Sequence, residues 1–227
     1  IPGHDGELLL ISQNKHLFEQ LGVQLIISDP ELIEISRDKE KWALKFDADM
    51  PIVPTFKLRN MKFDDVSEDF FPAILKPSGG SASQDIFIVD SVEELIRVSS
   101  EYPEHVCQKY LFPKDGSPAI KDLRVAVKNK RVIQMEEISL QLSYNRNSEL
   151  VGVFCSQNAL KAGVPTEIRP LDPDRFKIEI SKIDLALKKM NVRGPVNLQG
   201  RLTNDGIVFF EMNLRFTGIT GCRSQFG

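Results

Sequence analysis

Hydrophobic and polar positions follow two different periods along this chain, and the changes of period divide it into helices and strands. Near the start, "ELLLISQNKHLFEQLGVQLIIS" (residues 7–28) predicts a helical segment followed by a short apolar strand, "VQLII" (23–27). The next segment, "SRDKEKWALKFDADMP" (36–51), predicts a helix that stops before its proline. This alternation is typical of an α/β unit.

The middle of the chain predicts short strands separated by glycine and proline. "PAILKP" (72–77) and "IFIV" (86–89) predict two strands joined by the small-residue loop "SGGSASQD" (78–85). A helix should begin next, because Ser91 and Glu94 have the spacing of a capping box.

The third quarter mixes several patterns. "HVCQKYL" (105–111) predicts a strand, and "LRVAVKNKRVIQMEEI" (123–138) predicts a hairpin. Residues 143–170 are polar and predict irregular structure. A helix should begin at Asp172-Pro173, because the following apolar residues are spaced by 4, 3, 4 and 3. That apolar stripe consists of Phe176, Ile180, Ile183, Leu187 and Met190.

The segment "VNLQGRLTNDGIVFFEMNLRF" (196–216) predicts a second hairpin. Asn204, Asp205 and Gly206 form a three-residue loop with glycine last, which is a common connection between antiparallel strands. In that register Thr203 faces Ile207, and the pairing of every other residue follows from it.

Counting back from the turn places Gln199 opposite Glu211. Asn213 lies on the same face because side chains alternate along a strand, and Arg215 follows one step further. Three oxygen-bearing side chains, one of them anionic, suit a hard cation such as Mg²⁺. Phosphate oxygens of a substrate usually complete the coordination shell of that ion. The alternative is the polar outer face of a half-buried sheet, and the pattern alone leaves both open.

Lys76 ends a buried-looking strand directly before the small-residue loop 78–85. Backbone N–H groups in such a loop can approach a phosphate without obstruction by Cβ atoms, and a lysine adds a positive charge. A flexible hairpin tip is the alternative interpretation of the same residues.

Composition narrows the class of protein. The chain has 227 residues, 41% hydrophobic and 27% charged, which is enough for one large domain or two modest ones. Its net charge of −3 gives no general electrostatic reason to expect nucleic acid. No apolar run approaches the roughly 20 residues that a membrane span needs, so we expect no membrane partner. We expect the chain to be the interior of a longer protein, because it lacks an initiator Met.

The remaining reactive side chains predict no competing chemistry. The three cysteines are widely spaced without a CxxC motif, so we expect reduced thiols and a cytoplasmic location. Cys107 and Trp42 are expected in the core. His16 and His105 are expected at the surface or satisfied by neighbours rather than catalytic.

Taken in order, these segments resemble the ATP-grasp superfamily over nearly the whole chain. "DKEKWALKF" with "MPIVPT" resembles the Asp-Lys helix before the lid, "PAILKPSGGSAS" resembles the lid strand and phosphate loop, and "VCQKYL" resembles the hinge. "KDLRVAV" resembles the start of the large-lobe sheet. The most specific match is the hairpin, whose Glu-x-Asn-x-Arg pattern is intact at Glu211, Asn213 and Arg215.

The resemblance implies an α+β fold in which two α/β subdomains grip ATP. It places the tail of a Rossmann-like pre-ATP-grasp domain at residues 1–37 and the ATP-grasp domain at 38–227. Within that domain, the lid covers about 52–107 and the large subdomain about 108–227.

The resemblance also implies roles for individual residues. The nucleotide contacts would be Lys39, Lys76, Gly80, Ser81, Ala82, Ser83, Gln108, Lys109, Tyr110 and Leu111. The metal ligands would be Gln199, Glu211 and Asn213. Lys76 and Arg215 would assist catalysis near the phosphates.

The activity implied is that of an ATP- and Mg²⁺-dependent (or Mn²⁺-dependent) ligase, closest to carbamoyl-phosphate synthetase large subunits and carboxylate–amine ligases. ATP would convert a carboxylate into an acyl-phosphate, which an amine-like nucleophile then attacks; the substrate pair is unidentified, and a homodimer is left open. The family usually has Glu where this chain has Gln108 and Gln199. These departures leave open a non-catalytic ATP-binding or assembly module, and a phosphotransferase on the same fold is a third alternative.

Overall fold

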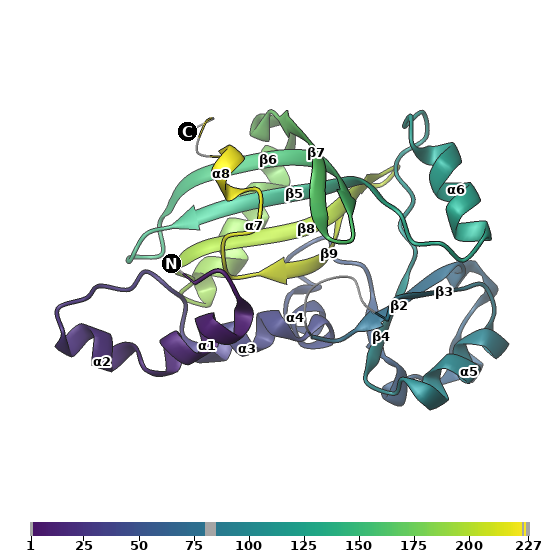
Figure 1. Cartoon of the computed structure of the whole chain (residues 1–227), viewed down its shortest axis with the longest axis horizontal. Helices are drawn as coiled ribbons and strands as arrows, with labels where there is room; N and C mark the ends of the chain where they lie inside the picture. The colour runs from purple at the N-terminus through teal and green to yellow at the C-terminus, as the bar shows by residue number, and fades with distance from the viewer. Residues whose placement is uncertain (1, 80–84, 224, 226–227) are drawn as a thin grey trace.

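The computed structural model describes residues 2–79, 85–223 and 225. Its described part contains two β-sheets with helices packed around them (Figure 1). The helices are α1 (Asp5–Gln13), α2 (Lys15–Gln20), α3 (Pro30–Arg37), α4 (Lys39–Phe46), α5 (Val92–Glu101), α6 (Ile120–Lys128), α7 (Lys177–Lys189) and α8 (Thr220–Arg223). The strands are β1 (Thr55–Lys57), β2 (Ala73–Pro77), β3 (Phe87–Val89), β4 (His105–Lys109), β5 (Gln134–Tyr144), β6 (Leu150–Lys161), β7 (Val164–Leu171), β8 (Gly194–Thr203) and β9 (Gly206–Asn213). This mixed composition matches the expected α+β class.

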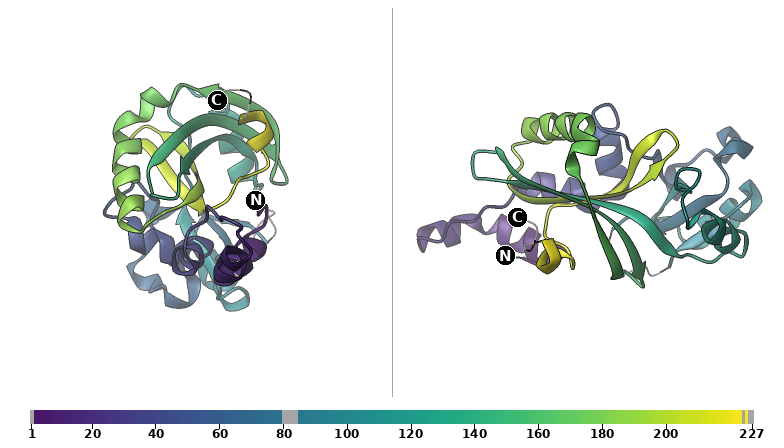
Figure 2. Two further views of the ribbon diagram at one scale, coloured as in Figure 1. Left: turned by 90° about the vertical axis from the view of Figure 1, so that its left-hand side faces the viewer. Right: turned by 90° about the horizontal axis from the view of Figure 1, so that it is seen from above.

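The larger sheet has the antiparallel order β7-β6-β5-β8-β9 and curves strongly (Figure 2). One face is apolar and forms the main core with α3, α4 and α7. Trp42 of α4 is fully buried there, as expected. The predicted apolar stripe of α7 packs into the same core, so that prediction is confirmed.

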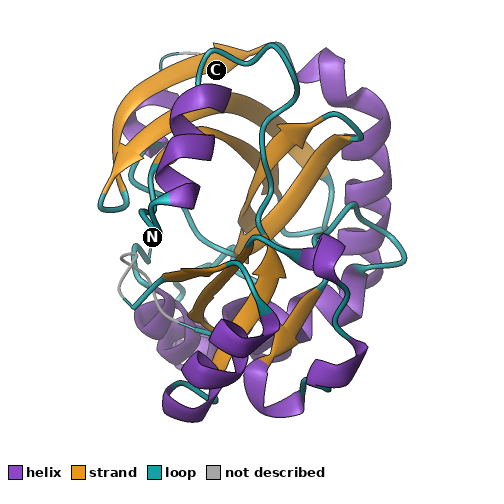
Figure 3. Cartoon of the chain, turned by 90° about the vertical axis from the view of Figure 1, so that its right-hand side faces the viewer, coloured by secondary structure: helices purple, strands orange, loops and turns teal. Residues whose placement is uncertain are grey.

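The smaller sheet has the antiparallel order β1-β4-β2-β3. Leu95 of α5 and Cys107 of β4 belong to the core on one face, whereas Leu123 and Val127 of α6 pack with Ile88 of β3 in a separate cluster. Figure 1 shows α5 and α6 on opposite sides of the small sheet, and Figure 3 shows this end of the molecule from the right-hand side of that view. Ser91 caps α5 by accepting a hydrogen bond from the Glu94 N–H, as predicted.

The hairpin predicted over residues 123–138 is wrong in its first arm, as is the large-sheet strand expected in "KDLRVAV", because residues 120–128 form α6. Residues 134–138 of the second arm do form a strand, the start of β5. The alternation of Leu123, Val125 and Val127 suggested a strand. In the structure Val125 is 61% exposed, and the buried residues are instead Leu123 and Val127, four positions apart. A helix places Ala119, Leu123 and Val127 on one face and leaves Val125 exposed, whereas a strand would bury Val125 on the same face as Leu123 and Val127.

The strand expected at "VQLII" (23–27) is also wrong, because residues 23–29 have no regular structure. Ile27 is buried, but Val23 and Ile26 are 44% and 46% exposed. The segment is held by side chains instead: the Ser28 hydroxyl donates to the Arg193 carbonyl oxygen, 3.0 Å away. Without a neighbouring strand, an apolar run has no ladder to join.

Residues 143–170, expected to be irregular, contain the end of β5, all of β6 and most of β7. Their polarity was misleading because β6 buries polar side chains. Ser156 is fully buried and Asn158 is 6% exposed, on the face opposite the apolar core. The large sheet therefore has a polar buried face, which composition alone cannot distinguish from a loop.

The C-terminal hairpin forms as predicted from β8 and β9, with Gln199 opposite Glu211. The turn differs by one residue, since Thr203 faces Gly206 rather than Ile207. A β-bulge at Phe210 adds one residue to β9 and restores the predicted pairing. The two differences cancel, so both Gln199 and Glu211 face away from the apolar core.

Among the residues that the structure describes, no helix has the length and apolar character needed to cross a membrane.

Candidate active site

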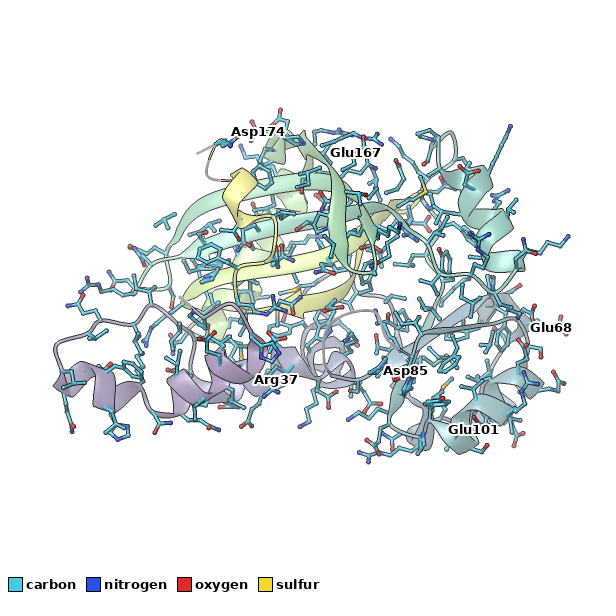
Figure 4. All side chains as sticks on the ribbon, viewed as in Figure 1. Arg37, Glu68, Asp85, Glu101, Glu167 and Asp174 are labelled. Carbon is cyan, nitrogen blue, oxygen red and sulfur yellow. The ribbon has the colours of Figure 1, made fainter. Side chains whose placement is uncertain are left out.

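A cavity of about 460 Å³ lies between the two sheets. Its walls come from the ends of β2 and β4, the segment after β4, and the polar faces of β5, β8 and β9. Figure 4 shows the side chains, with Asp85 labelled at the small-sheet side of this cavity. The sequence-predicted residues that line it are Lys39, Lys76, Gln108, Lys109, Tyr110, Leu111, Gln199, Glu211, Asn213 and Arg215.

Lys39, Lys76 and Glu211 bring two cations and one anion together in the cavity. Lys39 lies on the first turn of α4, and its Nζ is 4.0 Å from Glu211 Oε2. Lys76 reaches the same region from β2 of the small sheet and is 8% exposed. A buried cluster with more positive than negative charge suits an anionic ligand.

The surroundings change the proton affinity of these groups. Burial lowers the pKa of Lys76 to about 7, with the Glu211 carboxylate opposing that shift and Lys39 adding to it. Burial raises the pKa of Glu211, but the charges of Lys39 and Lys76 outweigh burial and hold that pKa below its ordinary value. Glu211 is therefore ionised near neutral pH, and Lys76 titrates there.

The bulge at Phe210 places a backbone carbonyl in the site. The Phe210 oxygen accepts hydrogen bonds from Lys76 Nζ at 3.4 Å and from Gln108 Nε2 at 3.3 Å. The Phe210 ring also lies beneath the ammonium, 4.6 Å from Nζ. Gly200 sits opposite the bulge, where an added Cβ would come within 2.4 Å of the Val208 oxygen.

The segment Gln108–Leu111 passes along the cavity between β4 and α6. Gln108 is 1% exposed and also donates to Thr55 Oγ1 at 2.8 Å, so its side chain ties β4 to β1. The Tyr110 N–H bonds to the Pro72 oxygen at 2.9 Å. Lys109 has an exposed side chain. This segment therefore lines the cavity from a position that contacts with both neighbouring strands hold fixed.

Arg201 and Glu137 are cavity residues that the sequence did not suggest. Arg201 is 5% exposed and donates to the Leu111 oxygen at 2.5 Å and the Met135 oxygen at 3.0 Å. Glu137 lies directly across from it in β5, with 4.0 Å between Arg201 Nη2 and Glu137 Oε1. Burial raises the pKa of Glu137, although Arg201 and Lys76 act against that rise.

A signal for Arg201 was present, since it lies two residues after Gln199 on the same strand. Glu137 could not be assigned, because the preceding residues were predicted as the wrong hairpin.

The predicted metal ligands lie together on β8 and β9. Gln199 is directly opposite Glu211, and Asn213 Nδ2 lies 3.3 Å from Glu211 Oε1. Within the described ranges, the structure has no group of three or more His, Cys, Asp or Glu side chains that could hold a metal. The oxygen ligands that this predicted metal site offers are therefore the amides of Gln199 and Asn213 and the carboxylate of Glu211.

Arg215 lies just beyond β9 and makes a bidentate ion pair with Asp5 of α1. Its Nε is 2.5 Å from Asp5 Oδ1, and its Nη2 is 3.3 Å from Asp5 Oδ2. Nη1 donates to the Phe216 oxygen at 3.2 Å. Asp5 is a further site residue that the sequence did not suggest, because its partner lies 210 positions away.

Some sequence predictions lie elsewhere. Gly80, Ser81, Ala82 and Ser83 are outside the described residues, although Gly79 before them lines the cavity. His105 is 8% exposed and its Nε2 lies 2.8 Å from the Asp85 oxygen, so it is satisfied, as expected. Burial raises the pKa of Cys107 and of Cys155 to about 12, which makes both thiols inert.

No family model matches the sequence, and neither does any curated protein. Solved structures do match the fold. The biotin carboxylase domain of 2-oxoglutarate carboxylase from Hydrogenobacter thermophilus, in complex with MgADP, ADP and bicarbonate, has a TM-score of 0.63 and 20% identity, over 92% of this chain and 47% of its own. D-alanine–D-alanine ligase from Bacillus anthracis, complexed with ATP, has a TM-score of 0.61 and 16% identity, over 94% of this chain and 66% of its own.

An ATP-grasp superfamily protein from Archaeoglobus fulgidus gives a TM-score of 0.57 at 14% identity, over 96% of this chain and 56% of its own. The chain spans about half the length of the first structures it matches, with shares of 47%, 48% and 52%. These identities are low, so they bear on the fold alone. Two sheets with a charged cavity between them, matched over nearly the whole chain, show that this protein has the ATP-grasp fold.

Proposed function

We propose that this chain is the nucleotide-binding part of an ATP- and Mg²⁺-dependent ligase. It would form an acyl-phosphate from a carboxylate and condense it with an amine-like nucleophile, releasing ADP and phosphate. The observation that carries the proposal is the convergence of Lys39, Lys76 and Glu211 on one cavity of an ATP-grasp fold. Such a cluster supplies charge and metal-binding oxygen where a triphosphate needs both.

The nucleotide would lie along the cavity. Its base would meet the backbone of Gln108–Leu111, and its phosphates would meet Lys39 and Lys76. Gly80, Ser81, Ala82 and Ser83, which lie outside the described residues, would contact the phosphates, as the sequence resemblance implies. The division into a lid at about 52–107 and a large subdomain at about 108–227 remains part of this proposal, as does a preceding Rossmann-like domain.

The residues present fit Mg²⁺ or Mn²⁺ bound together with a phosphate. Both ions prefer oxygen ligands, and Gln199, Glu211 and Asn213 offer them on neighbouring strands. With a single carboxylate, the protein alone would hold the ion weakly, so nucleotide oxygens would have to complete the shell. When bound, the ion would neutralise negative charge on the phosphates.

The proposed reaction has two balanced steps. A carboxylate oxygen bonds to the γ-phosphorus of ATP as the bond from that phosphorus to the ADP oxygen breaks. The amine nitrogen then bonds to the acyl carbon, phosphate leaves, and the amine loses a proton to solvent. Lys39, Lys76 and Arg215 would hold positive charge around the transferred phosphoryl group in the first step. With bicarbonate in place of the carboxylate and ammonia as the nucleophile, the same two steps would give a carbamate, which a second ATP would have to phosphorylate to yield carbamoyl phosphate.

The chain spans only about half the length of the first known structures that it matches, and its substrates are unidentified. The proposal therefore specifies a carboxylate and an amine without naming them, and it leaves a homodimer open. A cytoplasmic location belongs to the same proposal, in keeping with the free, buried thiols of Cys107 and Cys155.

A non-catalytic nucleotide-binding module is the second candidate. It is favoured by the neutral Gln108 and Gln199 and by the single carboxylate among the metal donors. A Gln199→Glu variant separates the two. If charge at this position limits the activity of an enzyme, the variant should gain ATP turnover, whereas a non-catalytic module should gain little.

The first test is calorimetric titration of ATP into the chain with and without Mg²⁺. The proposal expects binding that tightens with Mg²⁺. In a subsequent screen of carboxylates and amines, the enzyme should release ADP and phosphate together. This result distinguishes a ligase from a phosphotransferase, which would yield ADP without free phosphate. Failure to bind ATP under either condition would contradict the nucleotide assignment for this chain.

A further inference from the structure

The ion pair between Asp5 and Arg215 joins the N-terminal helix to the end of β9. Both side chains are largely buried, at 14% exposure for Arg215 and 17% for Asp5. Figure 1 shows the tip of β9 directed toward α1, whereas the segment between β4 and α6 lies on the other side of the fold. Arg215 lines the cavity, and Asp5 contacts it from α1.

The contacts with Asp5 and Phe216 orient the Arg215 guanidinium without using all of its N–H donors. Among the described residues, Arg215 makes three N–H contacts, to both Asp5 oxygens and to the Phe216 carbonyl. A guanidinium has five N–H groups, so two remain to meet a ligand in the cavity that Arg215 lines. A planar donor fixed at one edge presents its other edge in a defined direction.

An unsupported arginine at this place would be poorly oriented. Arg215 lies two residues beyond the end of β9, so the sheet ladder does not hold it. Ordering a free arginine side chain costs about 2 kcal/mol, which a ligand would otherwise have to offset. Asp5 orders the side chain before any ligand arrives, which is the arrangement that strong electrostatic stabilisation needs.

Asp5 also influences the neighbouring carboxylate. Its negative charge acts on Glu211, where it opposes the lowering of the Glu211 pKa by the lysines. The carboxylate is therefore close to the cluster of Lys39, Lys76 and Glu211 as well as to Arg215. Its position in the first turn of α1 makes residues from opposite ends of the chain part of one site.

We propose that Asp5 is a positioning residue that holds Arg215 in the orientation needed to contact the terminal phosphate of a bound nucleoside triphosphate. This assignment rests on the proposed function, which places phosphates in this cavity. A competing arrangement is that Asp5 occupies Arg215 and must be displaced by the phosphate. The two arrangements predict opposite effects when the charge of Asp5 is removed.

The test compares MgATP and MgADP affinities by calorimetry, because only MgATP carries the terminal phosphate. Arg215→Gln should weaken MgATP about tenfold and leave MgADP within about twofold. Asp5→Asn should weaken MgATP in the same selective way. The double variant should be no weaker than Arg215→Gln alone, because Asp5 acts through Arg215.

Asp49→Asn is the matched control, since Asp49 pairs with Lys189 outside the cavity at 3.2 Å. It should leave the MgATP to MgADP affinity ratio unchanged. Urea unfolding of every variant reports fold stability separately. If Asp5→Asn does not fold, Asp5→Glu replaces it in the test, because it keeps the charge but displaces the carboxylate by one methylene. The ratio of MgATP to MgADP affinity should still fall in Asp5→Glu, while its unfolding midpoint stays unchanged.

Three outcomes overturn the assignment. Tighter MgATP binding by Asp5→Asn would show that Asp5 competes with phosphate. An unchanged ratio with a lowered unfolding midpoint would show a purely structural ion pair. If the wild-type chain bound neither nucleotide, the proposed function would fail first and the assignment with it, and this outcome is recognisable before any variant is made.

Discussion

The Lys76 ammonium lies above the Phe210 ring and donates a hydrogen bond to the carbonyl oxygen of the same residue. Through Lys76, and through Gln108 on the same carbonyl oxygen, the small sheet contacts the large sheet at the centre of the candidate site. Burial of that lysine makes its charge sensitive to pH near neutrality, because its pKa falls to about 7.

Nucleotide affinity should therefore fall as pH rises through 7. Phosphate binding favours protonated Lys76, so MgATP should bind about tenfold more weakly at pH 8 than at pH 6. At pH 8 binding should also take up a proton. Calorimetry in two buffers of different ionisation enthalpy measures both effects, and Lys76→Met should abolish the uptake. Proton uptake that persists in Lys76→Met would assign it to another group.

The stability of the unliganded chain should change in the opposite direction with pH. The pKa of Lys76 is about 7 in the folded chain and 10.5 in its ordinary state, so the unfolded chain holds the extra proton between these values. Stability contributed by this group therefore rises with pH from about 7 to 10.5. Lys76→Met should flatten that rise in urea unfolding midpoints, and an identical pH profile would contradict it.

Glu211→Gln should remove the Mg²⁺ dependence of ATP binding while the fold remains intact. Glu211 is the one carboxylate among the three proposed ligands, so its loss leaves a neutral donor set. Calorimetry with and without Mg²⁺ checks this result, with Glu68→Gln, at an exposed position outside the cavity, as the control. Unchanged Mg²⁺ dependence in Glu211→Gln would remove the metal assignment.

Gly200→Ala should distort the bulge and weaken the site. The new Cβ would meet the Val208 oxygen at 2.4 Å, and backbone cannot yield as a flexible side chain does. We expect a loss of about 1 to 3 kcal/mol in the free energy of unfolding, together with weaker MgATP binding. Gly152→Ala is the control, because its nearest neighbour would be Ser143 Cβ at an ordinary 3.7 Å. Equal stability of the two variants would refute this account of Gly200.

Arg201→Met should lower the free energy of unfolding by about 3 kcal/mol, because it leaves the buried Glu137 without its cation. The pKa of Glu137 is already raised, so the folded chain holds that proton to higher pH than the unfolded chain. Stability of Arg201→Met should accordingly fall as pH rises above the ordinary Glu range. Adding Glu137→Gln should recover part of the loss in urea unfolding, whereas additive losses would show that the two residues are uncoupled.

The sequence correctly predicted the elements whose hydrophobic spacing or turn residues fit only one type of secondary structure. The apolar spacing of α7 and the β8–β9 hairpin are both confirmed, and the hairpin brought Gln199 and Glu211 together as expected. Lys39 and Lys76 were assigned by resemblance, and the structure places both in the cavity, although their roles stay predictions.

Other features depend on contacts that a linear sequence does not display. The polar residues of β6 predicted a loop, although they are buried in the structure. The alternation around Val125 predicted a strand, whereas packing against the small sheet favours the helix α6. Asp5 and Arg215 meet only because α1 packs beside the end of β9. Short-range periodicity carries no information about such pairings.

The pairing of β9 with β8 does not depend on the bulge at Phe210. Without Phe210, Gly200 would still face Phe209, and the next rung of an unbroken ladder would still pair Gln199 with Glu211. The alternation of inward and outward residues would also survive, with Phe209 toward the core and Glu211 toward the cavity. Phe210 is thus an inserted residue that the architecture does not require. Deleting it should yield a folded chain whose Lys76 and Gln108 have lost their shared acceptor, which separates the folding of this hairpin from its chemistry.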